Sequence, residues 1–316
     1  MAVATPPASR SGGSLGSERR SEAIAGYLLV AIPIVLFLLL NIGQIFYALY
    51  ISFWEWGLRG PRDFLGLGNY QDVLGDRVFH RAVTNTLYYA VLVVPLQMAL
   101  GLFLAVIVNA KLRGQTFFRA AFYFPAVASS AAITVLFLFI FAPDGLFNEA
   151  RAVLPFDVLG NLFGFPPNQN WFGKSDTALN MVILLNAWTT SGTMMLFYLA
   201  FLQTISTEVY EAAAIDGAGS WQMFRRITFP LLRPAHYFVA TVSLIGALQL
   251  FDQALIAGGP SGEPNNALTT VVLYLYRAGI RETDFGYAAA VGVILFTIIF
   301  TITLVQRRLF GQAPAW

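Results

Sequence analysis

The chain has 316 residues, of which 57% are hydrophobic and 11% charged, with a formal net charge of +2. A soluble domain carries about 25% charged residues and must present a wetted surface, so this composition excludes a soluble globular protein and indicates a membrane protein. The chain contains no cysteine. Disulfides, thiolate metal sites and cysteine nucleophiles are therefore excluded.

The first 22 residues are rich in Ser, Gly, Pro and Ala and contain no long apolar run, which predicts a disordered cytoplasmic tail. The apolar stretch that follows is too long for a signal-peptide core and lacks a small-residue cleavage site, so we expect it to stay in the mature protein. Residues 23–312 are predicted to form one all-α, polytopic transmembrane domain. Six stretches are long enough to cross a hydrocarbon core of about 30 Å: 24–53, 85–110, 118–142, 178–204, 236–257 and 287–305.

The distribution of Lys and Arg predicts the orientation. The tail, the second and fourth connections and the C-terminus hold eleven basic residues against five acidic ones. Because cytoplasmic loops carry the excess of basic residues, both termini are expected in the cytoplasm. The outward connection 61–84 can hold a short amphipathic helix. The longer one, 143–176, is expected to be functional or to contain short elements of its own.

The fourth connection, residues 205–234, is charged and lies between two apolar spans; we call it the coupling loop. A helix is expected over 206–215, a break at Asp216 and Gly217, and a second short helix capped by Ser220. Pro230 and Pro234 are expected to stop that second helix. Aromatic and basic side chains share its face, so an interfacial linker lying on lipid headgroups is one interpretation.

The spacing within this loop resembles the EAA motif of membrane subunits of ABC importers. The matching residues are Glu211, Ala212, Ala213, Gly217, Ile227 and Pro230, with Phe229 where Leu is usual. Asp216, Trp221, Phe224 and Arg225 resemble the carbohydrate-uptake branch of that family. Phe64, Gly66, Leu67, Asn69 and Tyr70 are similar to a motif of the first of its two permease types, the maltose or glycerol-3-phosphate permease-like type.

This resemblance implies a type I ABC importer permease fold with six transmembrane helices, in a bacterial or archaeal plasma membrane. It implies that the coupling loop docks on a cytoplasmic ATPase, with Glu211 contacting a basic residue and Gly217 allowing the turn. The implied partners are a second homologous permease, two copies of the ATPase and an extracytoplasmic solute-binding protein. ATP and Mg²⁺ would bind to the ATPase, and this chain is expected to hold no cofactor.

Motifs of catalysis are missing. Gly173, Lys174 and Ser175 resemble the end of a P-loop, but Asn168 stands at the first glycine position, so we expect no nucleotide site. His80 and His236 are predicted on opposite sides of the membrane and cannot share a site. No metal-binding motif and no basic footprint for nucleic acid is present. We therefore predict a transport subunit, not an enzyme.

Polar residues inside spans indicate a pathway, because they are costly in lipid. We predict that a group in the fourth and fifth spans lines it: Asn186, Trp188, Gln249, Phe251, Asp252 and Gln253. For Ser and Thr in the spans we favour hydrogen bonds within and between helices. No Lys or Arg cluster lies within the predicted spans, which favours a neutral sugar over glycerol phosphate or another solute. An ATP-independent secondary transporter or channel, and a non-transporting scaffold, are the alternatives.

Overall fold

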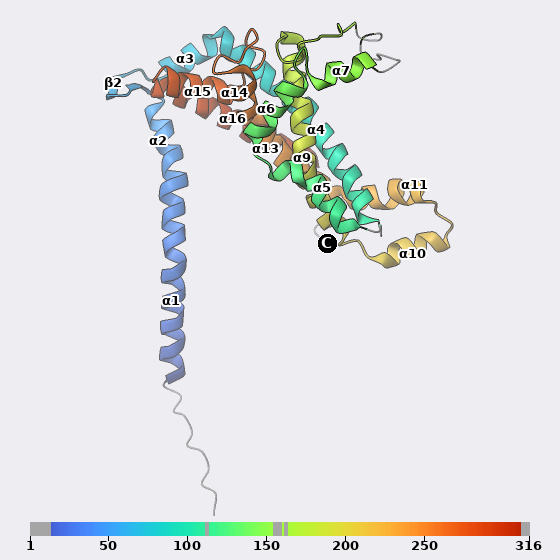
Figure 1. Cartoon of the computed structure of the whole chain (residues 1–316). Helices are drawn as coiled ribbons and strands as arrows, with labels where there is room; N and C mark the ends of the chain where they lie inside the picture. Colours follow the sequence, from blue (N-terminus) through green and yellow to red (C-terminus); the bar gives the residue numbers. More distant parts are fainter. Residues whose placement is uncertain (1–13, 111–113, 154–159, 161–163, 311–316) are drawn as a thin grey trace, which may run out of the picture.

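The computed structural model describes residues 14–110, 114–153, 160 and 164–310, and these are almost entirely helical (Figure 1). Five segments are long and apolar enough to cross a membrane. They are the segment formed by α1 (Ser14–Phe37), η1 (Leu38–Ile42) and α2 (Gly43–Ile51); α4 (Arg77–Asn109); α9 (Ser175–Leu202); α13 (Arg233–Leu248) with α14 (Asp252–Gly258); and α16 (Phe285–Phe310). These confirm five of the predicted spans.

The predicted third span is not one straight helix. Residues 115–140 form α5 (Gln115–Val127) and α6 (Ser130–Ile140), which meet at 92°. Pro125, three residues before the end of α5, has no N–H for the helical ladder. Ala128 then turns to an extended conformation, with φ −70° and ψ 152°. Counted as one broken span, the pair brings the total to the predicted six.

A small hairpin and a short helix follow the first span, and the hairpin was not predicted. Strands β1 (Trp54–Gly57) and β2 (Gly60–Phe64) pair antiparallel, and α3 (Gly68–Gly75) supplies the amphipathic helix expected in this connection. The buried Asn69 side chain donates hydrogen bonds to the Ser52 and Trp54 carbonyls, at 2.9 and 3.0 Å. It thereby fixes the hairpin to α3. Helix α4 begins at Arg77, earlier than the predicted residue 85.

The long connection before α9 is compact around a buried polar centre. It contains the short helix α7 (Leu146–Val153), as expected for a loop of this length. The Asn148 amide donates to the Ala142 and Gln169 carbonyls, and Trp171 Nε1 donates to Asn148 Oδ1 at 2.9 Å. The Arg151 guanidinium lies 5.5 Å from the Trp171 ring centroid and donates to the Phe165 carbonyl. Buried polar groups with partners hold one arrangement, so α7 is firmly placed.

The core lies between α4 and α9, with α5 and α13 packed beside them. At Gly101 of α4, an added Cβ would lie 2.5 Å from the Met194 Cβ of α9, so only glycine permits this approach. Gly192 of α9 plays the same part against α5, where a Cβ would lie 2.5 Å from the Phe122 carbonyl oxygen. Close backbone contact between small residues is typical of helix packing in membranes.

The first span stands apart from this core. None of the residues in its apolar 18-residue window is buried, and Figure 1 shows α1 extending away from the other helices. Only its end is attached, because α2 and the hairpin pack against α16. Helix α1 begins at Ser14, within the stretch predicted to be a tail. Residues 1–13 and 311–316, which belong to the predicted tail and the end of the domain, lie outside the described residues.

Candidate coupling loop and transport cavity

The first arm of the coupling loop is helix α10 (Thr207–Ile215). Ser206 caps it, since its Oγ accepts a hydrogen bond from the Glu208 N–H at 3.2 Å. The predicted break is confirmed: Gly217 has φ +79°, a conformation that residues with a side chain adopt at a cost. The N–H groups of Gly217 and Ala218 bond back to the Ala214 and Ala213 carbonyls, which completes a Schellman end. The glycine therefore sets the direction of the elbow.

The second arm consists of α11 (Ser220–Met223), the π-helical turn η2 (Phe224–Thr228) and α12 (Phe229–Leu231). The expectation that Ser220 caps it is wrong, because Gly219 occupies that position without a side-chain bond. Pro230 also does not stop the helix, which tolerates a proline in the first turn of α12. Pro234 lies in the first turn of α13 in the same way. The two arms are joined by a hydrogen bond between the Tyr210 and Thr228 hydroxyls at 3.1 Å.

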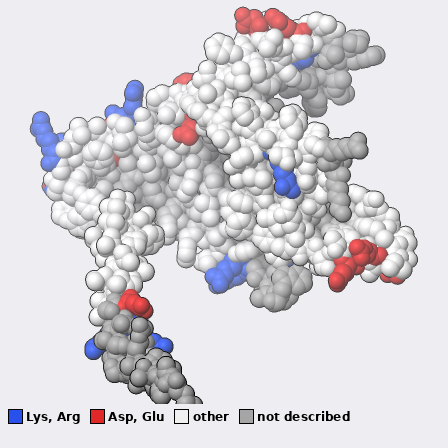
Figure 2. Space-filling model, turned by 60° about the horizontal axis from the view of Figure 1, so that its bottom comes forward, with Lys and Arg blue, Asp and Glu red and all other residues white. Residues whose placement is uncertain are grey.

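Most residues of the EAA-like motif are exposed. Trp221 is 71% exposed and stacks on Phe224, with ring centroids 5.6 Å apart. Ala213 is buried against the loop, and Ile227 is half-buried. The exposed members are Glu211, Ala212, Asp216, Gly217, Trp221, Arg225 and Pro230. Figure 2 shows acidic side chains gathered at the end of the molecule that carries α10, on a surface otherwise largely free of charge. The loop thus presents charge and aromatic rings to a partner.

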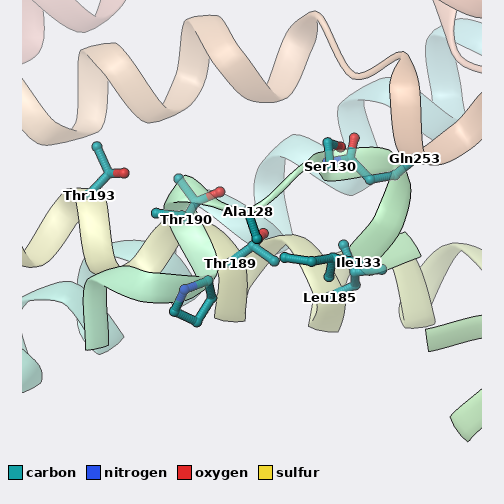
Figure 3. A pocket seen from close by; sticks show the side chains of 10 residues that line it. Ala128, Ser130, Ile133, Leu185, Thr189, Thr190, Thr193 and Gln253 are labelled. Atoms are coloured by element: carbon teal, nitrogen blue, oxygen red, sulfur yellow. The ribbon is translucent and has the colours of Figure 1, made fainter. Parts of the chain in front are cut away.

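A cavity of about 170 Å³ lies at the break between α5 and α6 (Figure 3). Helix α9 supplies three threonines to it and α14 supplies Gln253. Its lining consists of Pro125, Ala126, Ala128, Ser130, Ile133, Leu185, Thr189, Thr190, Thr193 and Gln253. Segments distant in the sequence therefore meet at a small polar space beside the core.

Polar groups of the cavity are fixed to different degrees. Thr189 donates its hydroxyl hydrogen to the Asn186 carbonyl oxygen at 3.2 Å, and Thr190 donates to Asn186 Oδ1 at 3.1 Å. The Ser130 Oγ is buried and has no hydrogen-bond partner among the described residues. Ser130 is also the first residue of α6, whose N-terminus carries no side-chain cap. A buried hydroxyl without a partner is costly, so a solute or water that fills the cavity would satisfy it.

The predicted pathway residues fall into different places. Gln253 lines the cavity, whereas Asn186 accepts a hydrogen bond from Gln97 of α4 at 2.7 Å and is not in the lining. Trp188 packs on Phe137, with centroids 5.7 Å apart, and is 45% exposed. The remaining three lie around the gap between α13 and α14: Phe251 packs on Tyr276, while Gln249 and Asp252 are exposed. The structure therefore brings only part of the predicted group together.

Sequence reasoning missed the cavity as a place, because its lining comes from four helices. Thr189 and Thr190 stood out as polar residues in a span but were assigned to helix packing. The available signal was the combination of Pro125 with Ser129 and Ser130, which follow it closely in an apolar stretch. A proline before small polar residues weakens a helix, and a break inside a membrane is tolerated only where it faces protein or water.

The remaining motifs take structural positions. Lys174, from the P-loop-like stretch, donates to the buried Gln169 side chain at 3.0 Å, and Asn170 Oδ1 accepts from the Gly173 N–H at 2.8 Å. His236 contacts the Tyr198 hydroxyl at 3.0 Å. No group of three His, Cys, Asp or Glu suited to a metal ion occurs within residues 14–310 where they are described.

Comparison with known proteins assigns this architecture. Residues 97–312 match the family model described as binding-protein-dependent transport system inner membrane component. The arabinooligosaccharides transport system permease protein AraP of Bacillus subtilis (strain 168) is 33% identical, over 92% of this chain and 90% of AraP. The lactose transport system permease protein LacF of Rhizobium radiobacter is also 33% identical, over 93% of this chain and 96% of LacF.

A solved structure has the same fold. It is the bacterial alginate ABC transporter in complex with an alginate pentasaccharide-bound periplasmic protein; the match has a TM-score of 0.75 and 21% identity, and covers 93% of this chain and 96% of the other. The predicted membrane location and importer permease fold are thereby confirmed, as is the prediction of a transport subunit over an enzyme. The chain belongs to the family of inner membrane components of binding-protein-dependent transport systems.

Proposed function

We propose that this chain is one of two permease subunits of an ATP-driven importer for neutral sugars. Its relatives AraP and LacF carry arabinooligosaccharides and lactose in their names, and both match over at least nine tenths of this chain. The single observation that carries the mechanism is the coupling loop. It projects from the membrane bundle as two short helices, linked only by the elbow at Gly217 and one hydroxyl pair.

In this proposal the loop transmits work from a separate ATPase. Glu211 and Asp216 offer carboxylates at the rim of the docking surface, and Trp221 offers an exposed ring at its centre. Aromatic anchors surrounded by charge are typical of interfaces that bind tightly. Two copies of the ATPase, which bind ATP and Mg²⁺, would grip this loop and its counterpart on the second permease. This chain supplies no nucleotide site of its own.

The first span supports a second permease as partner. Its apolar surface is unburied along its length, and helices α4, α9 and α16 expose further large apolar side chains. Lipid covers part of this surface, and a homologous subunit covers the rest. The two chains would then enclose the pathway between them. The exposed Gln249 and Asp252, with Gln253 in the cavity, would line this chain's half of the pathway.

The orientation follows from the same arrangement. The coupling loop and the end of α16 lie near one end of the molecule, and the hairpin, α3 and α7 lie at the other (Figure 1). We place the first end in the cytoplasm, in line with the excess of Lys and Arg in the connections on that side. The opposite end, with α7 held firmly by its polar centre, faces the solute-binding protein.

Purification of the tagged chain in mild detergent tests this proposal. We expect a second permease and an ATPase in one-to-one-to-two proportion, by quantitative mass spectrometry. Liposomes containing that complex should take up a neutral sugar only with ATP inside and the binding protein outside. If the chain purified alone and moved sugar without ATP, a secondary transporter would replace this proposal.

A further inference from the structure

The cavity at the α5–α6 break has a lining without charge, which bears on the kind of sugar it can hold. None of the described residues around it is Lys, Arg, His, Asp or Glu. A carboxylate or phosphate that entered would lose its hydration without meeting a cation, and burial of an unpaired charge is very costly. This step rests on the proposed function, because it assumes that the imported solute passes through the cavity.

The threonines of α9 turn one wall of the cavity into a hydrogen-bond acceptor. A hydroxyl has one hydrogen to donate and two lone pairs that accept. Thr189 and Thr190 both direct their hydrogens at Asn186, to its carbonyl oxygen and to Oδ1. Only the lone pairs of these two oxygens remain for a solute. A sugar hydroxyl can donate to them, whereas a carboxylate, which only accepts, is repelled.

Gln97 determines which way the Asn186 amide points. The Gln97 side chain is 3% exposed, and its Nε2 donates to Asn186 Oδ1 at 2.7 Å. An amide nitrogen can only donate, so this bond requires the oxygen of Asn186 on that side. The same oxygen then receives the Thr190 hydrogen. If the amide turned over, its NH₂ group would face Thr190, and the Thr190 hydroxyl would be free to donate into the cavity.

The opposite wall provides donors. The α6 N-terminus, where Ser130 is the first helical residue, has backbone N–H groups without helical partners, and Gln253 carries an amide. A hydroxyl group can therefore accept on one side and donate on the other. We propose that the cavity takes neutral sugar hydroxyls and excludes acidic sugars, and that Gln97 is the positioning residue that sets this preference through Asn186 and Thr190.

The absence of cysteine allows a direct test in the assembled complex with both permeases and the ATPase. Ser130→Cys places one thiol in the cavity, and Ser261→Cys places one on the exposed outer loop as reference. The probes are methanethiosulfonates of similar size that carry a hydroxyethyl, a sulfonatoethyl or a trimethylammonioethyl group. Relative to the reference thiol, the hydroxyethyl probe should label the cavity at least about tenfold faster than the sulfonate.

The role of Gln97 is tested by Gln97→Met in the Ser130→Cys background. Loss of the donor should reduce the preference for the neutral over the anionic probe by about fivefold, the value of one neutral hydrogen bond. Tyr88→Phe is the matched control. It removes the hydrogen bond from Tyr88 to Asn180, at 2.8 Å, between the same two helices but away from the cavity. It should loosen the α4–α9 contact without changing the preference.

A second pair of variants covers the case in which Gln97→Met does not assemble. Thr190→Val removes the acceptor and should reduce the preference, while Thr190→Ser retains it. Equal labelling by the hydroxyethyl and sulfonate probes in the parent would overturn the assignment of neutral sugars. Equal shifts from Gln97→Met and Tyr88→Phe, or from Thr190→Val and Thr190→Ser, would overturn the positioning role. Labelling requires no transport, so these outcomes are separate from a failure of ATP-driven uptake.

Discussion

The coupling loop and the cavity belong to one transport cycle but are built in opposite ways. The loop is a continuous stretch of 30 residues whose motif members are mostly exposed, and its shape depends on local bonds such as those around Gly217. The cavity collects single residues from four helices, and its polar groups are held by bonds across the core. The loop is thus suited to transmit force to a partner, and the cavity to select a solute.

This difference predicts two separable sets of defects. Variants in the loop should stop ATP from driving transport and leave the preference among sugars unchanged. Variants in the cavity should change the rate or preference of uptake and leave the ATPase docked. A variant in either region that produced both defects would show that transmission and selection share residues.

The largest effect is expected at Glu211. Glu211→Lys reverses an exposed charge at the proposed ATPase interface, and like charges brought together at an interface cost several kcal/mol. ATP-driven uptake should fall by at least about tenfold, and the ATPase should dissociate more easily during gel filtration. Glu208→Lys is the control, because Glu208 is exposed on the same helix but lies outside the motif. Equal losses in the two variants would point to general loss of negative charge.

A smaller effect is expected at the elbow. Gly217→Ala places a side chain at φ +79°, where left-handed backbone costs about 1–2 kcal/mol, so uptake should fall about fivefold. Gly219→Ala is the matched control, since Gly219 has φ −75° and an added Cβ meets no atom within 4 Å. Uptake and ATPase co-purification measure both. Normal transport in Gly217→Ala would mean that the elbow geometry is not required for coupling.

The cavity gives the complementary result. Gln253→Leu removes the amide that lines it from α14, and the loss of one or two hydrogen bonds should lower maximal uptake by about three- to tenfold. ATPase co-purification should be unchanged. Gln222→Leu, on the exposed surface of α11, is the control for loss of an amide elsewhere. Unchanged uptake in Gln253→Leu would remove this residue from the pathway.

The same contrast explains what the sequence could predict. Apolar length identified five spans because each is a property of consecutive residues, and the break at Gly217 followed from a single residue type. The 92° bend between α5 and α6 was not predicted, since an apolar stretch reads as one helix until its packing against α9 is known. Asn186 was correctly singled out as polar. Its bond to Gln97, 89 positions away, could not be deduced from spacing.

A third region, at the proposed outer end, should affect neither transmission nor selection. Asp76 caps α4 by accepting from the Val78 N–H at 2.6 Å, and it accepts from the Tyr274 hydroxyl of α15 (Val271–Tyr276) at 2.5 Å. Burial alone would raise the pKa of Asp76. The Tyr274 and backbone hydrogen bonds and the Arg277 charge outweigh it and hold the pKa below the ordinary value of 3.8. The ionised carboxylate therefore fastens α15 to the start of α4.

Asp76→Asn gives the smallest effect and should alter stability alone. A carboxyl with a lowered pKa stabilises the folded state above its unfolded pKa of 3.8, and this contribution is lost as pH falls through the folded pKa. At neutral pH the variant complex should melt about 2–4 °C below the parent, with unchanged sugar preference and ATPase docking. Below pH 3.8 the two melting temperatures should converge, because the parent carboxylate is then protonated. A difference that stayed constant down to pH 3 would assign the effect to packing and not to charge.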